Sequence, residues 1–269
     1  MNAPDSASAV EPLVLSRASA GVAHLTLNRP LQFNALSEQM LAALQTALDQ
    51  VRADASIRAV VIGGAGKAFC AGHDLKQMKA NPRAQYYQKL FSDCARIMRG
   101  LQCLPQPVIA RVHGVATAAG CQLVAMCDLA VAADVARFAV SGINAGLFCS
   151  SPSVALSRNI GRKQAFEMLV TGEFIDAQAA LARGLVNRVV ALSDLDAEIA
   201  RLTDQIVAKP ALALRMGKEL FYRQLEMGID AAYQLAGQTM ACNMVDEVAQ
   251  EGVDAFIDRR PPRWPSPGA

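Results

Sequence analysis

The feature that most constrains the fold of this chain is the alternation of short β-branched apolar runs with segments of helical periodicity. Such runs occupy residues 58–63 (RAVVIG), 108–112 (VIARV) and 129–133 (LAVAA). Their length and β-branched content are typical of buried strands. Strands separated by helices need crossover connections, which place the strands parallel in one sheet. The sequence therefore predicts an α/β fold for the first two-thirds of the chain.

Local signals mark the beginning of this pattern. Two β-type runs lie on either side of Ala20-Gly21, which predicts a hairpin over residues 14–27. Ser37 then stands before apolar residues that recur at helical spacing from Met40 to Val51. A serine in that place accepts a hydrogen bond from a free N–H group of the first turn. Ser37 is therefore expected to cap a helix.

The second half of the chain also has start and stop signals. A long helix is expected over about residues 153–169, ending at Thr171-Gly172, because glycine readily ends a helix in the left-handed conformation. Asp176 is expected to cap the next helix, which ends at Gly184. Residues 185–190 then return to β-structure.

Three regions are predicted along the chain. Residues 1–12 form a short disordered tail, because they have neither the basic and apolar stretches of a signal peptide nor the arginines of a transit peptide. Residues 13–194 form the α/β core. Residues 195–269 form a helical appendage, which is broken at Lys209-Pro210 and ends in an irregular Pro-rich segment.

Composition and charge exclude several classes of function. The 26 basic and 24 acidic residues leave a net charge of +2, so no extended field of one sign is available to hold nucleic acid or a membrane surface. No apolar run is long enough to predict a membrane span. Seven scattered cysteines lack the spacing of metal ligands. We therefore expect reduced, mostly buried thiols, a cytoplasmic location and no metal site.

Two segments rich in small residues are candidates for chemistry. In residues 66–76 (GKAFCAGHDLK), Gly72 permits a positive φ and a close approach of the backbone to a ligand. In residues 113–122 (HGVATAAGCQ), a strand leads into a helix start, where free N–H groups face outward. Two such donors from separate loops are able to hold an oxyanion. Close packing is the commoner cause of such a pattern, so spacing leaves both interpretations open.

Four segments in order, over nearly the whole chain, resemble the enoyl-CoA hydratase/isomerase (crotonase) family. They are residues 28–36 (NRPLQFNAL), 66–78 (GKAFCAGHDLKQM), 113–133 (HGVATAAGCQLVAMCDLAVAA) and 168–190 (MLVTGEFIDAQAALARGLVNRVV). The resemblance implies a crotonase-like spiral of ββα units. It also implies that residues 195–269 are a C-terminal helical oligomerisation region, which makes a trimer that is often stacked into a hexamer.

The resemblance further implies an acyl-CoA thioester as substrate or ligand, with coenzyme A as part of the substrate and no separate cofactor. The thioester carbonyl is expected between the backbone N–H groups of His73 and Ala119. The residues that match the family's coenzyme A site are Arg29, Ala71, Asp74, Leu75, Lys76 and Gly120. The resemblance also makes Lys218 and Arg223 candidates to reach a neighbour's coenzyme A, as C-terminal basic residues do in relatives, although oligomer salt bridges explain these two residues as well.

The chain departs from the family's hydratases at both catalytic glutamates, whose positions hold Gln122 and Gly142. An amide exchanges no protons near neutral pH and glycine has no side chain, so ordinary hydration is expected to be severely impaired. His73 is the best remaining acid–base group by residue type. Cys149 is a candidate nucleophile by type, but a buried inert thiol is expected because no His/Asp partner is close in the sequence.

Two functions of different classes follow from these residues. One is an enzyme of acyl-CoA or fatty-acid metabolism that polarises a thioester and carries out isomerisation, decarboxylation or thioester hydrolysis. The other is a non-catalytic acyl-CoA-binding pseudoenzyme. RNA binding, known for some relatives, is not expected, because the sequence has no basic, aromatic-rich stripe.

Overall fold

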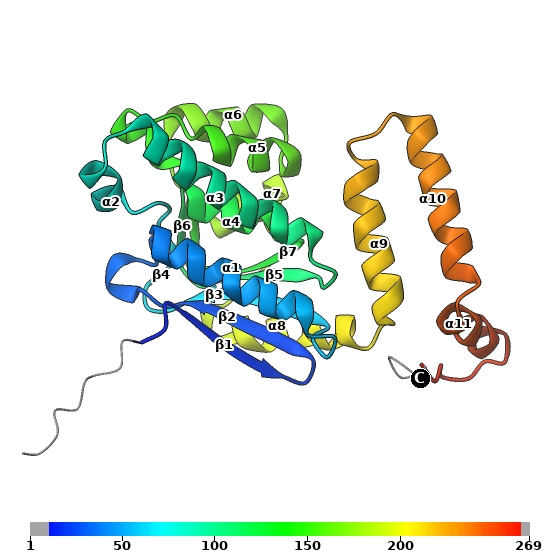
Figure 1. Ribbon diagram of the computed structural model, residues 1–269. Coiled ribbons are helices and arrows are strands. Elements are labelled where there is room, and N and C mark those ends of the chain that lie inside the picture. Colours follow the sequence, from blue (N-terminus) through cyan, green and yellow to red (C-terminus); the bar gives the residue numbers. More distant parts are fainter. Residues whose placement is uncertain (1–10, 265–269) are drawn as a thin grey trace, which may run out of the picture.

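The computed structural model describes residues 11–264, and the predicted tail at residues 1–12 lies almost entirely outside them. The chain forms a body of two β-sheets covered by helices, from which three helices extend as an arm, namely α9 (Ala211–Gln224), α10 (Ile229–Met244) and α11 (Glu247–Ile257) (Figure 1). No helix within residues 11–264 is long and apolar enough to span a bilayer.

The larger sheet has six strands in the order β1-β2-β3-β5-β7-β10. Its strands are β1 (Val14–Ser19), β2 (Val22–Leu27), β3 (Ala59–Gly64), β5 (Val108–Val112), β7 (Leu129–Ala133) and β10 (Arg188–Val190). β1 and β2 pair antiparallel across Ala20 and Gly21, which both have positive φ, whereas all other neighbours are parallel. The predicted hairpin and the predicted parallel sheet are confirmed.

The smaller sheet has four short strands in the order β4-β6-β8-β9. They are β4 (Ala68–Cys70), β6 (Val115–Thr117), β8 (Arg137–Ala139) and β9 (Ile175–Asp176). β4, β6 and β8 each come next in the chain after a parallel strand of the larger sheet, namely β3, β5 and β7. This repeated strand pair is the spiral of ββα units, so the predicted fold class is confirmed.

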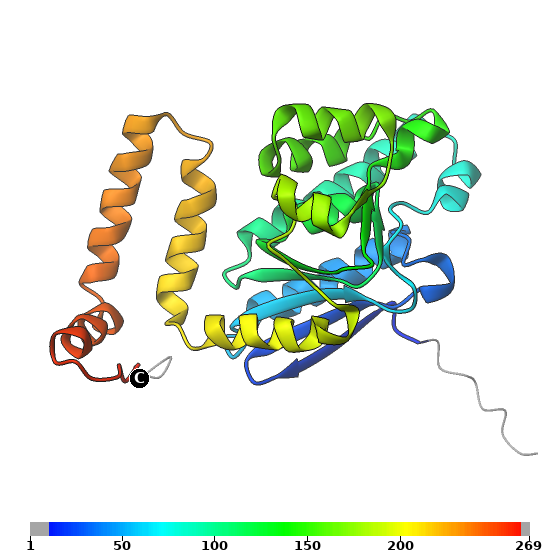
Figure 2. The ribbon, with the colours of Figure 1, turned by 180° about the vertical axis from the view of Figure 1, so that it is seen from behind.

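Helices cover both faces of the larger sheet. Strand β3 lies between two apolar clusters, and its successive side chains point to opposite faces of the sheet. Val60 and Ile62 belong to the first cluster, while Val61 belongs to the second. The main helices over the first cluster are α1 (Glu38–Ala53), α3 (Ala84–Cys103), α4 (Ala119–Met126), α5 (Ser150–Asn159), α6 (Arg162–Thr171) and α7 (Ala177–Arg183). The second cluster lies under α8 (Leu195–Val207), on the back of the sheet (Figure 2). The helical region predicted over residues 195–269 therefore begins with a helix that packs on the body.

The predicted helix caps are confirmed. Ser37 accepts a hydrogen bond from the N–H of Met40 at 3.2 Å, at the start of α1. Asp176 accepts one from the N–H of Ala179 at 2.7 Å, at the start of α7. Gly172 ends α6 in the left-handed conformation, as expected of a glycine that follows a helix.

Two predictions need correction. The single helix expected over about residues 153–169 is two helices, because Ile160 is extended and Gly161 is non-helical between α5 and α6. The 20-residue helix α3 was not predicted at all, although it supplies part of the candidate site. The remaining short elements are α2 (Leu75–Ala80) and the 3-10 turns η1 (Pro30–Gln32), η2 (Ser141–Ala145) and η3 (Leu192–Asp194).

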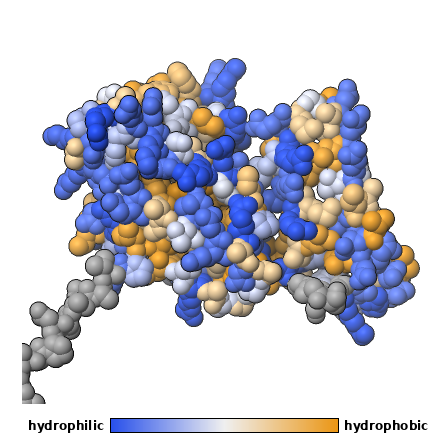
Figure 3. All heavy atoms as spheres, viewed as in Figure 1, coloured by the Kyte–Doolittle hydropathy of each residue, from blue (hydrophilic) through white to orange (hydrophobic). Residues whose placement is uncertain are grey.

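The arm presents many large apolar side chains to solvent. It consists of α9 (Ala211–Gln224), α10 (Ile229–Met244) and α11 (Glu247–Ile257). Apolar residues gather on it in the space-filling view (Figure 3). The most exposed include Leu225, Ile229, Tyr233, Met240, Val245, Phe256 and Ile257. Apolar surfaces of this extent usually mark an interface.

A buried ion pair attaches α9 to the body. The Nζ of Lys218 donates to the Asp128 carboxylate at 2.6 Å and to the carbonyls of Leu101 and Gln106 at 2.8 and 2.9 Å. The hydroxyl of Tyr222 donates to the same carboxylate at 2.6 Å. Only 7% of the Lys218 side chain is exposed. Lys218 is therefore an internal anchor and does not reach out towards a neighbour's coenzyme A.

Candidate functional site

Two backbone segments meet at Gly72. This residue lies in the loop between β4 and α2, with φ of +89°. A Cβ atom placed on it would lie 2.8 Å from the Cβ of Ala118 and 3.0 Å from the backbone nitrogen of Ala119. Both the positive φ and this close approach require glycine. The loop after β4 and the start of α4 are therefore in direct contact, as the small residues of both segments suggested.

The backbone N–H of His73 faces away from the chain segment beside it. Leu36 forms a parallel bridge to His73, in which the N–H of Leu36 donates to Gly72 at 2.8 Å and the carbonyl of Leu36 accepts from Asp74 at 3.4 Å. In such a bridge the residue between the two bonded groups directs its own N–H to the opposite side. No acceptor for this N–H is present within residues 11–264.

The backbone N–H of Ala119 is a second donor that has no acceptor in the part of the chain from residue 11 to residue 264. Ala119 begins α4, and the first N–H groups of a helix have no acceptor within the helix. Ala118 before it has φ of +50°, and its own N–H donates to Ala139 at 3.0 Å. Gly120 packs so closely that a Cβ atom on it would lie 2.0 Å from the carbonyl oxygen of Cys70. The two adjoining loops thus offer one N–H group each, which suits a carbonyl oxygen or an oxyanion.

The imidazole of His73 is packed in an apolar setting. Its ring meets the ring of Phe91 edge-on, with 5.4 Å between centroids, and the ring of Tyr87 stacks on Phe91. Burial lowers the pKa of His73, an effect that the nearby carbonyl of Leu36 only partly offsets. The ring is therefore neutral at pH 7. Phe91 and Tyr87 belong to α3 and were missed with that helix.

Gln122 and Gly142, which stand at the two positions expected to hold catalytic glutamates, differ in the space around them. Gln122 lies one turn into α4, is 4% exposed, and its Oε1 has no hydrogen-bond partner within residues 11–264. At Gly142, an added Cβ atom would lie 2.6 Å from the carbonyl oxygen of Leu147 and 2.7 Å from the Sγ of Cys149. The first position holds a buried neutral amide. The second has no room for any side chain.

Cys149 does not have the surroundings of a nucleophile. Its thiol is buried beside Gly142, and burial raises its pKa. A thiol with a raised pKa is mostly protonated at neutral pH and reacts slowly. The expectation of an inert thiol is in keeping with this geometry. Within residues 11–264, no three His, Cys, Asp or Glu side chains come together in a way that fits a metal ion.

The residues that match the coenzyme A site lie at the outer edge of the same loop. Arg29 donates to the carboxylate of Asp74 at 3.2 Å. Asp74 also caps α2 by accepting from the N–H groups of Lys76 and Gln77. Burial alone would raise the pKa of Asp74, but these hydrogen bonds outweigh it and lower the pKa. Arg29 therefore already has a carboxylate partner, whereas Lys76 is exposed to solvent.

The remaining residues that were predicted to contact coenzyme A differ in their exposure to solvent. Leu75 is 61% exposed at the start of α2, and Ala71 is half-buried before Gly72. Ala71 and Leu75 therefore keep surface that a ligand can contact, whereas Ala119 is 2% exposed and Gly120 is buried.

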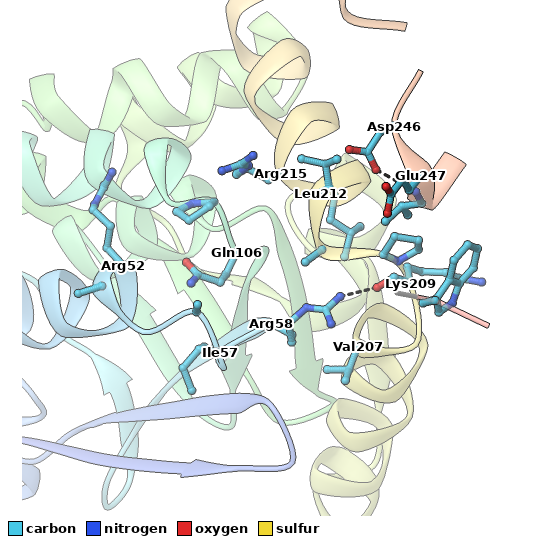
Figure 4. A pocket seen from close by; sticks show the side chains of 18 of the residues that line it. Arg52, Ile57, Arg58, Gln106, Val207, Lys209, Leu212, Arg215, Asp246 and Glu247 are labelled. Atoms are coloured by element: carbon cyan, nitrogen blue, oxygen red, sulfur yellow. Dashed lines mark hydrogen bonds between the residues drawn. The ribbon is translucent and has the colours of Figure 1, made fainter. Parts of the chain in front are cut away.

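A cleft of 880 Å³ lies apart from this site, between the body and the arm (Figure 4). Arg52, Arg58 and Gln106 line its body side, while Asp246 and Glu247 come from the arm. Arg58 donates a hydrogen bond across it to the carbonyl of Lys209. None of the predicted site residues lines this cleft.

Comparison with known proteins places the chain in a family. The enoyl-CoA hydratase/isomerase family model matches residues 17–267. The chain is 44% identical to enoyl-CoA hydratase domain-containing protein 3, mitochondrial, of Xenopus laevis, over 94% of this chain and 86% of that protein. Its identity to the Homo sapiens protein of the same name is 41%, over 91% of this chain and 80% of that one.

Solved structures agree with this placement. The crystal structure of an enoyl-CoA hydratase from Mycobacterium smegmatis is 64% identical, with a TM-score of 0.93 over 94% of this chain and 99% of that one. The structure of human enoyl-CoA hydratase domain-containing protein 3 is 40% identical, with a TM-score of 0.91 over 94% and 100% of the two chains. The chain therefore belongs to the enoyl-CoA hydratase/isomerase family.

Proposed function

We propose that this chain binds acyl-CoA thioesters and holds the thioester carbonyl between the backbone N–H groups of His73 and Ala119. The observation that carries the proposal is the contact at Gly72, where only 3.0 Å separates the position of a Cβ atom from the nitrogen of Ala119. That contact supports the proposal, because it joins the two separate loops whose N–H groups have no acceptor within residues 11–264. Ala71, Asp74, Leu75 and Lys76, with Gly120 behind them and Arg29 beside Asp74, would line the coenzyme A part of the ligand.

The polarised carbonyl supports chemistry that passes through an enolate or an oxyanion without a pair of carboxylates. Isomerisation, decarboxylation and thioester hydrolysis meet this condition. Hydration does not, because it needs groups that position water and move protons. Gln122 is an amide and Gly142 has no space for a side chain. We therefore propose an enzyme of acyl-CoA metabolism that is not an ordinary hydratase.

A non-catalytic acyl-CoA-binding role is the second candidate. It is favoured by the neutral character of the groups around the two donors. His73 has a pKa lowered by burial, and the thiol of Cys149 has a pKa raised by burial. A lowered pKa makes the imidazole of His73 a weaker base, and a raised pKa keeps the thiol of Cys149 protonated at pH 7. Turnover of any thioester in a panel of acyl-CoA compounds distinguishes the enzyme from the pseudoenzyme.

The exposed apolar arm supports a homo-oligomer. A trimer or a stack of two trimers would bury Ile229, Tyr233 and Phe256, which are 69%, 73% and 85% exposed in the single chain. Sedimentation at several protein concentrations tests this proposal. The cytoplasmic location stays a prediction, since the relatives from Xenopus laevis and Homo sapiens carry the word mitochondrial in their names. The absence of nucleic-acid and membrane partners likewise stays a prediction.

Binding is tested by calorimetry with butyryl-CoA and the Gly72→Ala variant. The new methyl group would meet Ala118 and Ala119 at a backbone φ that alanine rarely adopts. We expect affinity to fall about tenfold or more, because the two donors can no longer converge on one oxygen. Gly100→Ala on α3 is the matched control, since nothing lies within 4 Å of its added Cβ atom. Equal affinity in the natural protein and a folded Gly72→Ala variant would contradict the proposed site.

A further inference from the structure

The cleft between the body and the arm carries more positive than negative charge. Two acidic residues line it, whereas the basic residues in its lining are Arg52, Arg58, Lys209 and Arg215. None of these basic side chains forms an ion pair within residues 11–264. Cations gathered in a cleft reinforce one another's field and attract an anion. The cleft is therefore suited to a negatively charged ligand.

The arginines come from elements that are far apart in the sequence. Arg52 lies in the last turn of α1, Arg58 lies directly before β3, and Arg215 lies in α9. Arg52 and Arg58 each donate one hydrogen bond to a backbone carbonyl. A guanidinium group has five N–H donors, so each of the two keeps most of its donors for another partner. The planar fork of such a group matches the oxygens of a phosphate.

Gln106 adds an unused acceptor on the body side of the cleft. Its side chain is seen between Arg52 and Arg58 in the view of Figure 4, and the residue is 6% exposed. The Nε2 of Gln106 donates to the carbonyl of Val51 at 3.1 Å, whereas its Oε1 has no donor within the described part of the chain. A buried acceptor without a partner is costly, and a hydroxyl donor removes that cost.

The arm side of the cleft has a different character. The indole N–H of Trp264 donates to the carbonyl of Ala208 at 3.2 Å, and its ring packs 3.3 Å from the position of a Cβ atom on Gly252. The ring is thus held in place but stays 38% exposed, and a fixed aromatic ring offers a stacking surface to a base. Asp246 and Glu247 on this side disfavour phosphate and accept from hydroxyl or amino groups.

From these observations we propose that the cleft binds a nucleoside polyphosphate. Its phosphates lie on Arg52, Arg58 and Arg215, and its nucleoside lies towards Trp264. A ribose hydroxyl donates to Gln106, so both ends of the ligand find partners. The volume of 880 Å³ falls within the range of about 300–1,000 Å³ that is usual for ligand sites. The site is separate from the proposed carbonyl site, because no residue of that site lines the cleft.

The test is calorimetry on the full chain with metal-free ATP, with inorganic triphosphate and adenosine as the two halves of the ligand. We expect ATP to bind about tenfold or more tightly than either half. Arg52→Gln and Arg215→Gln should each weaken ATP binding about tenfold, because each removes charge-assisted hydrogen bonds. Both arginines are exposed, so the variants should fold. Arg99→Gln on α3 is the matched control, since Arg99 is exposed but lies outside the cleft.

The Gly72→Ala variant keeps this site apart from the proposed acyl-CoA site. We expect it to bind ATP as the natural chain does. A fall in ATP affinity in Gly72→Ala but not in the arginine variants would place the nucleotide in the acyl-CoA site and refute the proposal. A folded chain that does not bind ATP, or arginine variants that bind it unchanged, would refute it as well. Equal affinities for ATP and triphosphate would refute the role of the nucleoside.

Discussion

Replacing Lys218 by methionine tests the attachment of the arm to the body. The side chain of Lys218 is 7% exposed and that of Asp128 is 13% exposed, so the pair is largely removed from water. Methionine keeps much of the lysine volume but removes the charge and all three hydrogen bonds of the ammonium group. The carboxylate of Asp128 then stays buried without its cation.

The magnitude follows from what remains bonded to that carboxylate. Removing one partner of a buried ion pair costs about 3–5 kcal/mol of unfolding free energy. Asp128 keeps its hydrogen bonds from the Tyr222 hydroxyl and the N–H of Val108, both at 2.6 Å. These two bonds still stabilise the negative charge, so we expect the lower end of that range, about 3 kcal/mol.

Urea unfolding of natural and variant chains measures this difference. With a slope of about 3 kcal/mol per M, the midpoint should fall by roughly 1 M. Two protein concentrations are needed, because an oligomer's stability depends on concentration. Arg223→Met is the control, since the pair of Arg223 with Glu219 is exposed on the surface of α9 and is worth about 0.5 kcal/mol or less. A loss for Lys218→Met as small as for Arg223→Met would refute the anchor.

Two further predictions concern the candidate site. Because burial lowers the pKa of His73, the unfolded chain binds more protons than the folded chain below about pH 6.5, so the free energy of unfolding should fall as pH falls through this range. Urea unfolding at about pH 7.5 and about pH 5 should show a smaller fall in His73→Gln, and an unchanged fall would contradict the assignment. Gly142→Ala should cost about 1–3 kcal/mol, because the methyl group meets Leu147 and Cys149, and a stability equal to that of the natural chain would show that the loop yields easily.

Much of the fold could be predicted because its signals are local. Ser37 and Asp176 cap helices through N–H groups three residues away, and Gly172 ends one through its own backbone. The missed helix α3 also carried a signal, since its buried residues Leu90 and Cys94 recur at helical spacing. The prediction of one continuous helix over about residues 153–169 took no account of Gly161, although glycine weakens any helix.

Other features of the structure depend on contacts that no local pattern reveals. Lys218 meets Asp128 across 90 positions of sequence, so its role as an internal anchor could not be read from α9 alone. The lack of space at Gly142 comes from a turn that brings back Leu147 and Cys149. The sequence indicated that a carboxylate is absent there, but only the packing shows that substitution cannot simply restore it.

The most direct test of the account is hydration of crotonyl-CoA, followed by the loss of absorbance of the conjugated thioester. Binding of crotonyl-CoA is measured on the same sample, and the Gln122→Glu variant is assayed beside the natural protein. The account predicts that the natural chain binds the thioester but does not hydrate it at an ordinary enzymatic rate of about 1–1000 per second. Hydration at such a rate by the natural chain would contradict the account, because a neutral amide and a closed glycine position would then suffice to activate water.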